Sequence, residues 1–264
     1  MKAAILIPAR YQSSRYPGKP LAQICGATGV SKPLIQRSFE AATRVSNVAS
    51  VHVVTDDDRI ADAARLFGAP VLMTSPQCRN GTERCAEALS ELGEVDVVVN
   101  LQGDALLTPP HFVEALLQRM ADSSVAVATP AIRIASAEVR KLQQEEAHGR
   151  VGGTSVVVDA AGRALYFSKR LIPYLPHNAL KAELSPVRLH IGVYAYRPQA
   201  LRDYAARPVT ELETLEGLEQ LRFLVNGTPV AVVDVPPPPF VLRELNNPED
   251  LAPIEQALAD AGLE

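Results

Sequence analysis

The strongest constraint on the fold is the alternation of strand-sized apolar runs with segments of helical hydrophobic spacing. Residues 3–8 and 95–101 are near-continuous apolar runs, typical of strands in a parallel sheet covered on both faces. Between such runs, apolar residues such as Leu34, Ile35 and Phe39 recur at the spacing of one helix face. This order predicts an α/β fold with a doubly wound, mostly parallel sheet. The other elements expected in this half are strands over 51–55, 71–73 and 125–130, and helices over 34–45, 60–67, 82–92 and 112–120.

The second half of the chain has shorter apolar runs separated by longer loops. A charged amphipathic pattern predicts a helix over 210–225, and Pro248 suits the first turn of a final helix that ends near residue 259. The proline run 236–239 indicates a stiff connector more than a ligand for a proline-recognition domain. Residues 143–153 are expected to form a mobile loop between the two halves. The strands expected here cover 156–158, 164–167, 191–196 and 230–235.

Composition narrows the class of protein. The 264 residues suit one domain with a smaller lobe, and the net charge of −4 argues against nucleic-acid binding through a basic surface. The apolar runs are too short to span a bilayer, so no membrane partner is expected. Three cysteines without a C-x-x-C pair argue against a disulfide scaffold or a zinc site and favour a cytoplasmic setting. Any metal would be a hard ion held by carboxylate and phosphate oxygens.

The loop after the first strand, residues 8–20, is the most informative stretch. It holds Arg10, Arg15 and Lys19. Three cations in one loop repel each other, and a bound polyphosphate would neutralise them. Taken alone, the loop is more simply a solvated basic surface. It is not a Walker A loop, because that motif would need Gly at Ser13 and Ser or Thr at Pro20. No G-x-G-x-x-G follows a strand, so a dinucleotide fold has no support.

Two further loops carry polar groups. Gln102-Gly103-Asp104 ends the strand over 95–101, where Asp104 can reach a metal held by a phosphate chain, although an ordinary turn explains it as well. The segment 80–84 opens a helix, where free amides and Arg84 can hold an anion or a base edge. A simple helix cap is the alternative there.

These loops belong to a set of short motifs that occur in order along almost the whole chain: Pro8-Ala9-Arg10, Arg15-x-Pro17-Gly18-Lys19-Pro20-Leu21, Gly81-Thr82-Glu83-Arg84, Gln102-Gly103-Asp104, Ala164-Leu165-Tyr166-Phe167-Ser168, His190-Ile191-Gly192-Val193-Tyr194-x-Tyr196-Arg197, Leu215-Glu216-x-Leu218-Glu219-Gln220-Leu221-Arg222 and Pro248-Glu249-Asp250-Leu251. Together they resemble the CTP:3-deoxy-manno-octulosonate (Kdo) cytidylyltransferases. The resemblance implies a nucleotidyltransferase α/β sheet with a smaller lobe for dimerisation and sugar binding. Residues 1–264 would form one domain, with 1–130 mainly binding CTP and 150–235 forming the sugar-acid pocket and dimer lobe.

The same resemblance implies an activity. The chain would be a cytoplasmic homodimer that joins CMP to Kdo or a close relative, releases pyrophosphate, uses Mg²⁺ and serves lipopolysaccharide biosynthesis. The residues it implies are, for the nucleotide, Pro8, Ala9, Arg10, Arg15, Lys19, Arg84 and Gln102; for catalysis, Arg10, Lys19 and Asp104; for the sugar acid, His190, Tyr194, Glu216, Glu219 and Gln220; and for the metal, Asp104 and Asn246. Each sugar-acid residue also has a packing or surface alternative: His190 as a core histidine, Glu216 and Glu219 as an exposed helix face.

The chain departs from the family pattern at three places. Ala105 follows Asp104 where the family has Glu-Pro, Thr154-Ser155 replaces a Val-Lys pair, and Asn246 replaces the second metal-binding Asp. Glu244 could substitute for that Asp if the loop were shifted. The departures leave open transfer to another sugar acid, amino-deoxy or neuraminate-like, and a weakly active nucleotide-binding paralogue.

Overall fold

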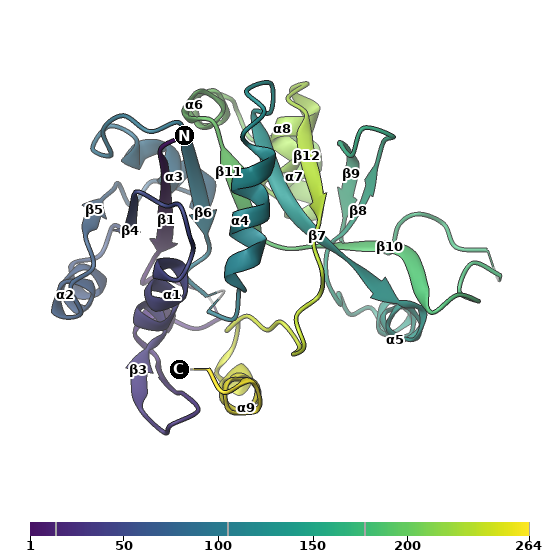
Figure 1. Cartoon of the computed structure of the whole chain (residues 1–264), viewed down its shortest axis with the longest axis horizontal. Coiled ribbons are helices and arrows are strands. Elements are labelled where there is room, and N and C mark those ends of the chain that lie inside the picture. The colour runs from purple at the N-terminus through teal and green to yellow at the C-terminus, as the bar shows by residue number, and fades with distance from the viewer. Residues whose placement is uncertain (14, 105, 177, 264) are drawn as a thin grey trace.

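One large sheet organises the computed structural model, which describes residues 1–13, 15–104, 106–176 and 178–263. Among these residues, ten strands form the sheet in the order β5-β4-β1-β6-β11-β7-β10-β8-β9, with β12 added to β7 (Figure 1). The strands are β1 (Ala3–Ala9), β4 (Ser50–Thr55), β5 (Val71–Met73), β6 (Val97–Leu101), β7 (Val127–Ala135), β8 (Ser155–Val158), β9 (Ala164–Ser168), β10 (Leu184–His190), β11 (Val193–Tyr196) and β12 (Val230–Asp234).

The half of the sheet that contains β1 is parallel, as the alternating pattern predicts. β1 pairs in parallel with β4 on one side and β6 on the other, and β5 extends β4. Beyond β6, the strand β11 is antiparallel to both β6 and β7, whereas β12 is parallel to β7. The α/β sheet is therefore confirmed, with an antiparallel extension. The carboxyl ends of β1, β4 and β6 share one edge, where α/β proteins bind ligands.

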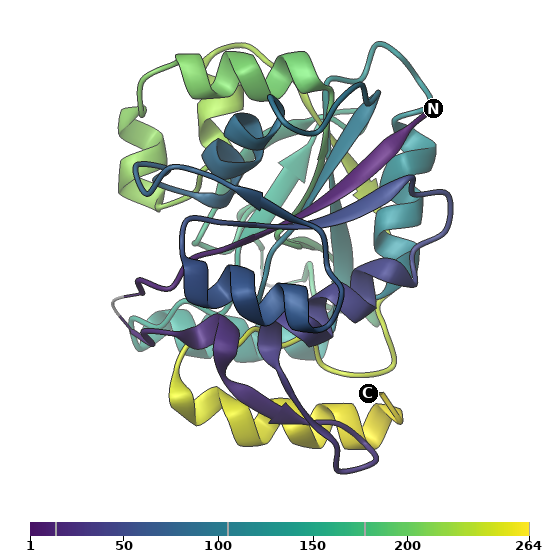
Figure 2. The same cartoon turned by 90° about the vertical axis from the view of Figure 1, so that its left-hand side faces the viewer.

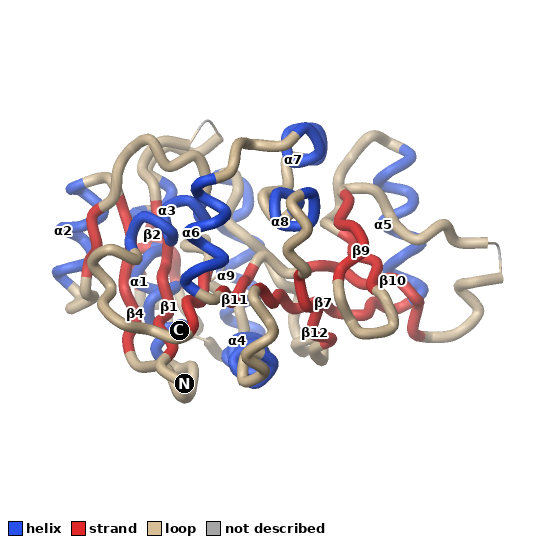
Figure 3. The backbone as a smooth tube through the Cα atoms, turned by 90° about the horizontal axis from the view of Figure 1, so that it is seen from above, coloured by secondary structure: helices blue, strands red, loops and turns tan. Residues whose placement is uncertain are grey.

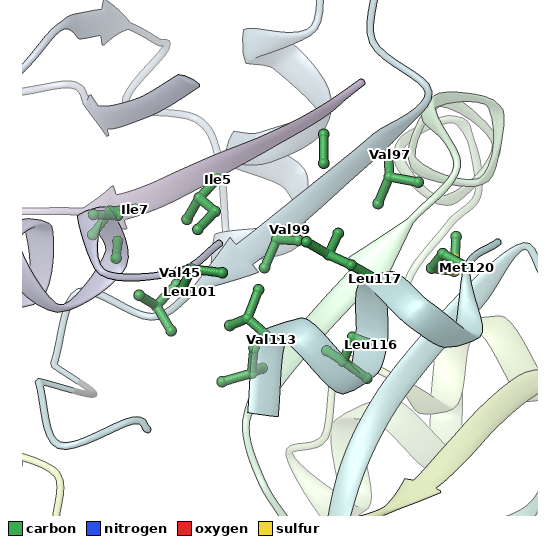
Figure 4. Packing of buried hydrophobic residues seen from close by; sticks show 14 of the residues in the cluster. Ile5, Ile7, Val45, Val97, Val99, Leu101, Val113, Leu116, Leu117 and Met120 are labelled. Atoms are coloured by element: carbon green, nitrogen blue, oxygen red, sulfur yellow. The ribbon is translucent and has the colours of Figure 1, made fainter. Parts of the chain in front are cut away.

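Helices cover both faces of this sheet. Alternate residues of β1 point to opposite faces, so Ile5 and Ile7 join one buried cluster and Leu6 joins the other. Figure 4 shows the first cluster, in which β1 and β6 side chains meet Val113 and Leu116 of α4. Helices α1 (Leu34–Thr43), α2 (Asp58–Leu66) and α4 (Pro110–Arg119) cover this face; α3 (Gly81–Ala88), α6 (Pro198–Ala206) and α8 (Leu221–Val225) cover the other.

A smaller lobe extends the far end of the sheet. It consists of β8, β9 and β10 with α5 (Ser136–Ala147), and Figure 3 shows α5 beside β10 at that end. Val139 of α5 is fully buried against Val187 of β10 and Ile134 of β7. The lobe therefore has its own apolar cluster while it shares the sheet.

The C-terminal segment returns to the first half of the chain. Helix α9 (Leu251–Ala261) packs beside the ribbon of β2 (Gln23–Cys25) and β3 (Ser31–Pro33), as Figure 2 shows at its lower end. Leu245, Ile254 and Leu258 are buried against Ile24 and Leu107. This packing holds the segment after β12 next to the loop that follows β6.

Two expected elements differ from the structure. Residues 143–147 belong to α5 and are not a loop, because Leu142 continues the buried side of that helix. The helix expected over 210–225 is two helices, α7 (Glu211–Glu216) and α8, since Gly217 adopts a left-handed φ of 60° that ends the first one. The structure also adds β2, β3, β10 and α6, which the sequence pattern did not predict.

Within the described ranges, no helix has the length and apolar character that crossing a membrane would require.

Candidate active site

A cavity of about 1170 Å³ opens at the carboxyl edge of the parallel strands. Its wall combines the loops after β1 and β6, the start of α3, the β10–β11 turn, the α7–α8 turn and the segment between β12 and α9. Of the residues predicted from the sequence, the wall brings together Pro8, Ala9, Arg10, Arg15, Lys19, Arg84, Gln102, Asp104, His190, Tyr194, Glu219, Gln220 and Asn246.

The parallel pairing explains why the first loops meet. Leu6 of β1 lies opposite Asn100 of β6, so β6 ends at Leu101, level with Ile7, and β1 runs on to Ala9 at the same edge of the sheet. Gly103 then passes close to β1: a Cβ at this position would lie 2.8 Å from the Pro8 carbonyl oxygen. The Gly103 carbonyl accepts a hydrogen bond from the Ser38 hydroxyl of α1 at 2.8 Å. A side chain at residue 103 would therefore separate the two loops that carry the cations and Asp104.

Cations and a carboxylate face each other at this end of the cavity. Lys19 Nζ lies 2.5 Å from Asp104 Oδ2, and both side chains are partly exposed to the cavity. Arg10 is exposed at the end of β1. Arg15 Nη2 donates to Asn246 Oδ1 at 2.9 Å. The three cations predicted from the first loop thus lie in one wall, together with both predicted metal ligands.

Arg84 is held more rigidly than the loop cations. It is 3% exposed, lies 3.2 Å from Asp56 Oδ1 through Nη2, and donates from Nη1 to Thr74 Oγ1 at 2.5 Å. Asn80 caps α3 by accepting from the Glu83 amide at 2.8 Å. The helix cap that sequence reasoning gave as the alternative is therefore present, and Arg84 also lines the cavity, where its guanidinium is held in place by Asp56 and Thr74.

His190, the last residue of β10, lies in the cavity wall as a neutral imidazole. Its Nε2 is 2.9 Å from the Thr129 hydroxyl, and its ring contacts those of Phe167 and Tyr194. Burial lowers the pKa of His190 to about 3. It is thus both a packed histidine and a cavity residue, and it can offer a hydrogen bond without a charge.

Gln220 carries an unused donor. The side chain is 2% exposed and lines the cavity, and its Nε2 has no hydrogen-bond partner among the described residues. Leaving a buried donor unpaired costs about 1–3 kcal/mol, so an acceptor on a ligand is the expected partner. Beside it, Glu219 Oε2 accepts from the Thr82 amide at 3.4 Å.

Glu216 differs from the other predicted sugar-acid residues, since within the described part of the chain it does not belong to the cavity wall. Its carboxylate accepts from Ser168 Oγ at 2.8 Å and from the Lys169 amide at 2.9 Å, which ties α7 to the end of β9. Lys169 itself lines the cavity next to Gly217. Sequence reasoning missed Lys169, although it directly follows the Ala164–Ser168 motif.

The positions that depart from the family pattern have different surroundings. Ser155 is buried; its hydroxyl donates to the Arg170 carbonyl at 2.5 Å and accepts from the Ile172 amide at 3.1 Å. Thr154 lines the cavity in its place. Asn246 lines the wall as expected, and Ala105 lies outside the described residues.

The donor set fits a hard divalent cation that phosphates help to hold. Asp104 offers a carboxylate and Asn246 an amide oxygen, the ligand types that Mg²⁺ prefers. Among the described residues, no three His, Cys, Asp or Glu side chains are grouped to hold a metal by themselves. A metal at this place would therefore depend on the oxygens of a bound phosphate chain.

Burial of Glu219 predicts a pH-dependent stability. Burial raises its pKa from 4.5 to about 7, so between these values the folded protein binds more protons than the unfolded chain. This group therefore lowers the free energy of unfolding as the pH rises through that window. We therefore expect the free energy of unfolding of Glu219→Gln, measured in urea, to rise relative to that of the wild type between pH 4.5 and about 7. Above about pH 7, the difference between the two proteins should stay constant. An identical pH dependence in both proteins would contradict the burial of this carboxyl.

Comparison with known proteins first identifies the general class of protein. A sequence profile described as cytidylyltransferase matches residues 4–232. The fold, the loop cations at the strand ends and this match together define a nucleotidyltransferase.

Closer relatives refine this class. The 3-deoxy-manno-octulosonate cytidylyltransferase of Maricaulis maris is 40% identical over 264 residues, which cover 99% of both chains. The mitochondrial enzyme of that name from Arabidopsis thaliana is 38% identical over 98% of this chain and 83% of its own. A solved structure of CMP:2-keto-3-deoxy-manno-octonic acid synthetase complexed with CTP superposes with a TM-score of 0.84 at 38% identity, covering 99% of this chain and 100% of that one. This chain belongs to the 3-deoxy-manno-octulosonate cytidylyltransferase family, so the resemblance found in the motifs is confirmed.

Proposed function

We propose that the protein transfers CMP from CTP to the anomeric C2 hydroxyl of 3-deoxy-manno-octulosonate or a closely related keto-deoxy sugar acid. The hydroxyl oxygen attacks the α-phosphorus, the bond to the β-phosphate oxygen breaks, pyrophosphate leaves and the hydroxyl proton is released. The observation that carries the proposal is one cavity that joins the cation-bearing loops to the His190 and Gln220 wall. Such transfer needs mainly positioning and charge neutralisation from the protein.

The loop cations would bind the triphosphate. Arg10 and Lys19 would neutralise charge on the transferred phosphoryl group, and Arg15 would hold the outer phosphates. Pro8, Ala9, Arg84 and Gln102 would lie against the cytidine, since they form the wall beside the start of α3. Mg²⁺ held by Asp104, with Asn246 as its second candidate ligand, would neutralise phosphate charge when bound.

The part of the wall that contains His190 and Gln220 would bind the sugar acid. Neutral His190, the Gln220 amide, Glu219 and Tyr194 offer hydrogen bonds to its hydroxyls, while Lys169 offers a positive charge to its carboxylate. Glu216 would act indirectly, because its hydrogen bonds fix the chain at Ser168 and Lys169. The pocket would therefore orient the C2 hydroxyl toward the triphosphate.

We also propose a homodimer formed through the smaller lobe, working in the cytoplasm of its cell. Leu165 of β9 and Leu184 of β10 are 62% and 52% exposed, which is unusual for large apolar side chains on strands. Light scattering during gel filtration should give twice the 28.4 kDa mass of the chain. Charged substitutions at both leucines should return the mass to that of one chain.

Base choice is the first prediction for this function. Because the surroundings of Ala9, Arg84 and Gln102 resemble a pyrimidine pocket, kcat/KM for CTP should exceed that for ATP or GTP by at least about 10²-fold. The triphosphates carry the same anion, so charge alone gives no such preference. Initial rates of pyrophosphate release with each nucleotide measure it. Comparable rates with ATP would contradict the assignment of the pocket.

The choice of sugar acid is tested separately. With CTP and Mg²⁺, pyrophosphate release should be fastest with 3-deoxy-manno-octulosonate among a panel that includes amino-deoxy and neuraminate-like acids. Thr154 lines the cavity beside the buried Ser155, where the family pattern has a Val-Lys pair, and the absence of that positive charge favours a different acid as the second candidate. A preference for another panel member would select that candidate. Tight CTP binding without turnover on the whole panel would select the nucleotide-binding paralogue.

A further inference from the structure

Glu219 lies where the turn between α7 and α8 meets the start of α3. It belongs to this turn together with Gln220, and its Oε2 accepts a hydrogen bond from the Thr82 amide of α3 at 3.4 Å. The preceding residue, Gly81, packs against the loop after β6, since a Cβ there would lie 2.9 Å from Gln102 Nε2. The carboxylate therefore stands between the residues proposed to bind CTP and those proposed to bind the sugar acid.

The Glu219 carboxylate can receive a further hydrogen bond. Its side chain is partly exposed and lines the cavity. An ionised carboxylate has about four acceptor sites on its two oxygens. The contact with Thr82 therefore leaves acceptor sites for a hydroxyl group of a bound substrate.

The proposed reaction needs a group that takes up one proton, because the C2 hydroxyl loses its proton as the oxygen attacks. Other polar groups of the wall are less suited to this task. Asp104 is paired with Lys19 Nζ at 2.5 Å. His190 Nε2 lies 2.9 Å from the Thr129 hydroxyl, and burial lowers the pKa of this imidazole to about 3, which makes it a weak base.

The basicity of Glu219 supports the same role. Burial raises the pKa of its carboxyl to about 7, although hydrogen bonds with Thr82 act in the opposite direction. A general base is most effective when its pKa lies near the working pH. Near neutral pH, Glu219 therefore combines a substantial ionised fraction with a higher affinity for protons than an ordinary carboxylate has.

We propose that Glu219 is the general base that accepts the proton of the C2 hydroxyl during CMP transfer. The O–H bond breaks toward the carboxylate while the hydroxyl oxygen forms its bond to the α-phosphorus. The bond from the α-phosphorus to the bridging oxygen breaks, and pyrophosphate leaves with that electron pair. The carboxyl group then returns the proton to water. The inference rests on the proposed function and gives Glu219 a catalytic role beyond binding.

The groups that surround Glu219 titrate away from neutral pH or carry a paired charge. Burial raises the pKa of the thiol and phenol groups that face it from α3, β11 and α6, which are Cys85, Tyr194, Tyr196 and Tyr204. The carboxylates nearby on α7 and α3 both pair with Arg222 of α8, and these are Glu213 and Glu83. The remaining cations on this side are Arg84 and Lys169. A change of rate near pH 7 would therefore report Glu219 and not a neighbouring thiol, phenol or imidazole.

The pH dependence of a single turnover tests this role. With enzyme in excess over CTP, and with saturating 3-deoxy-manno-octulosonate and Mg²⁺, the rate of pyrophosphate release by wild type should rise about tenfold per pH unit below 7 and level off above it. Glu219→Gln cannot accept the proton. Its rate at pH 8.5 should be lower by about 10²–10⁴-fold, the usual contribution of a general base, and the rise with pH should be lost.

Two further variants separate proton transfer from packing and from general charge. Glu219→Asp keeps a carboxylate, so the rise with pH should persist at a reduced rate. Glu138→Gln is the matched control, because Glu138 is another carboxylate in the cavity wall and lies 3.3 Å from Lys141 Nζ. This control should keep both the rate and the pH dependence of wild type. Thermal unfolding should show that all the variants are folded.

The outcomes distinguish this inference from the proposed function. If Glu219→Gln raises the KM for the sugar acid but keeps the rise of the rate with pH, Glu219 is only a hydrogen-bonding contact and the inference is wrong. A wild-type rate that does not change between pH 5.5 and 8.5 would also overturn it, while the proposed function would stand. If wild type releases no pyrophosphate with any sugar acid of the panel, the proposed function fails and the inference falls with it.

Discussion

Replacing Lys19 with alanine is expected to lower kcat for pyrophosphate release by about 10²–10³-fold, the usual cost of removing one charge-stabilising donor at a reacting centre. Lys19 lies in the cavity wall, where its Nζ pairs with Asp104. A triphosphate bound as proposed would compete with that carboxylate for the ammonium group, so the charge would be available to the transferred phosphoryl group. Arg10→Ala should reduce the rate in a similar range, because Arg10 is exposed in the same wall.

Lys32→Ala is the control for Lys19→Ala. Lys32 forms an ion pair with Glu40 at 2.8 Å, and its side chain is also partly exposed, but it lies outside the wall within the described residues. Steady-state measurements should give a normal rate of pyrophosphate release for Lys32→Ala. Thermal unfolding should give a normal melting temperature for Lys19→Ala, Arg10→Ala and Lys32→Ala. If Lys19→Ala and Arg10→Ala turn over like wild type, the first loop is only a solvated basic surface.

Replacing Arg222 with alanine is expected to destabilise the fold by about 3–5 kcal/mol, the cost of leaving a buried charge without its partner. Arg222 is 1% exposed and donates to Glu213 from Nε at 2.7 Å and from Nη2 at 2.5 Å. Its Nη1 also donates to Glu83 of α3 at 3.0 Å. The loss of this arginine would leave Glu213 buried and would disconnect α8 from α3.

Urea unfolding of Arg222→Ala measures this loss, with Arg188→Ala as its control. Arg188 of β10 makes two hydrogen bonds to Asp234 of β12, at 2.7 and 2.8 Å, in a pair that is partly exposed to solvent. Exposed pairs contribute about 0–1 kcal/mol, so this variant should unfold almost like wild type. Equal destabilisation by the two substitutions would show that the buried network does not hold α3 and α8 together.

The sequence predicted the part of the site that strand topology controls. An apolar run followed by Arg10 and another followed by Asp104 are enough to bring these residues together, because parallel strands end at one edge. β1 begins at Ala3 as expected and extends one residue further than predicted, to Ala9. At this edge of the sheet, the sequence pattern alone therefore predicts which residues the strand topology brings together.

The part of the cavity wall proposed to bind the sugar acid was less predictable because tertiary contacts determine it. Helical spacing over 210–225 does not reveal that Gly217 turns left-handed and separates two helices. Glu216 follows the same polar pattern as Glu219. A hydrogen bond from Ser168, 48 residues away in the sequence, holds Glu216 outside the cavity wall. Glu219 lines the cavity instead, where burial raises its pKa.

The strand β10 and the segment before α9 were also difficult to predict from the sequence alone. β10 alternates polar and apolar residues and contains Pro186, which is unusual for an interior strand, so its pattern resembles a loop. Glu244 lines the cavity, and its place there depends on Leu245, whose burial against α9 joins residues from both ends of the chain. No local pattern indicates which neighbour of a buried leucine faces a ligand.

Phosphorus NMR of a mixture of CTP, 3-deoxy-manno-octulosonate, Mg²⁺ and the protein tests the central claim most directly. We expect the CTP signals to be replaced by those of pyrophosphate and of one phosphodiester in equal amounts. The phosphodiester should join CMP to the C2 oxygen of the sugar acid. Without the sugar acid, the CTP signals should persist. Formation of CMP without a sugar ester, or of a phosphorylated sugar with CDP, would contradict the account.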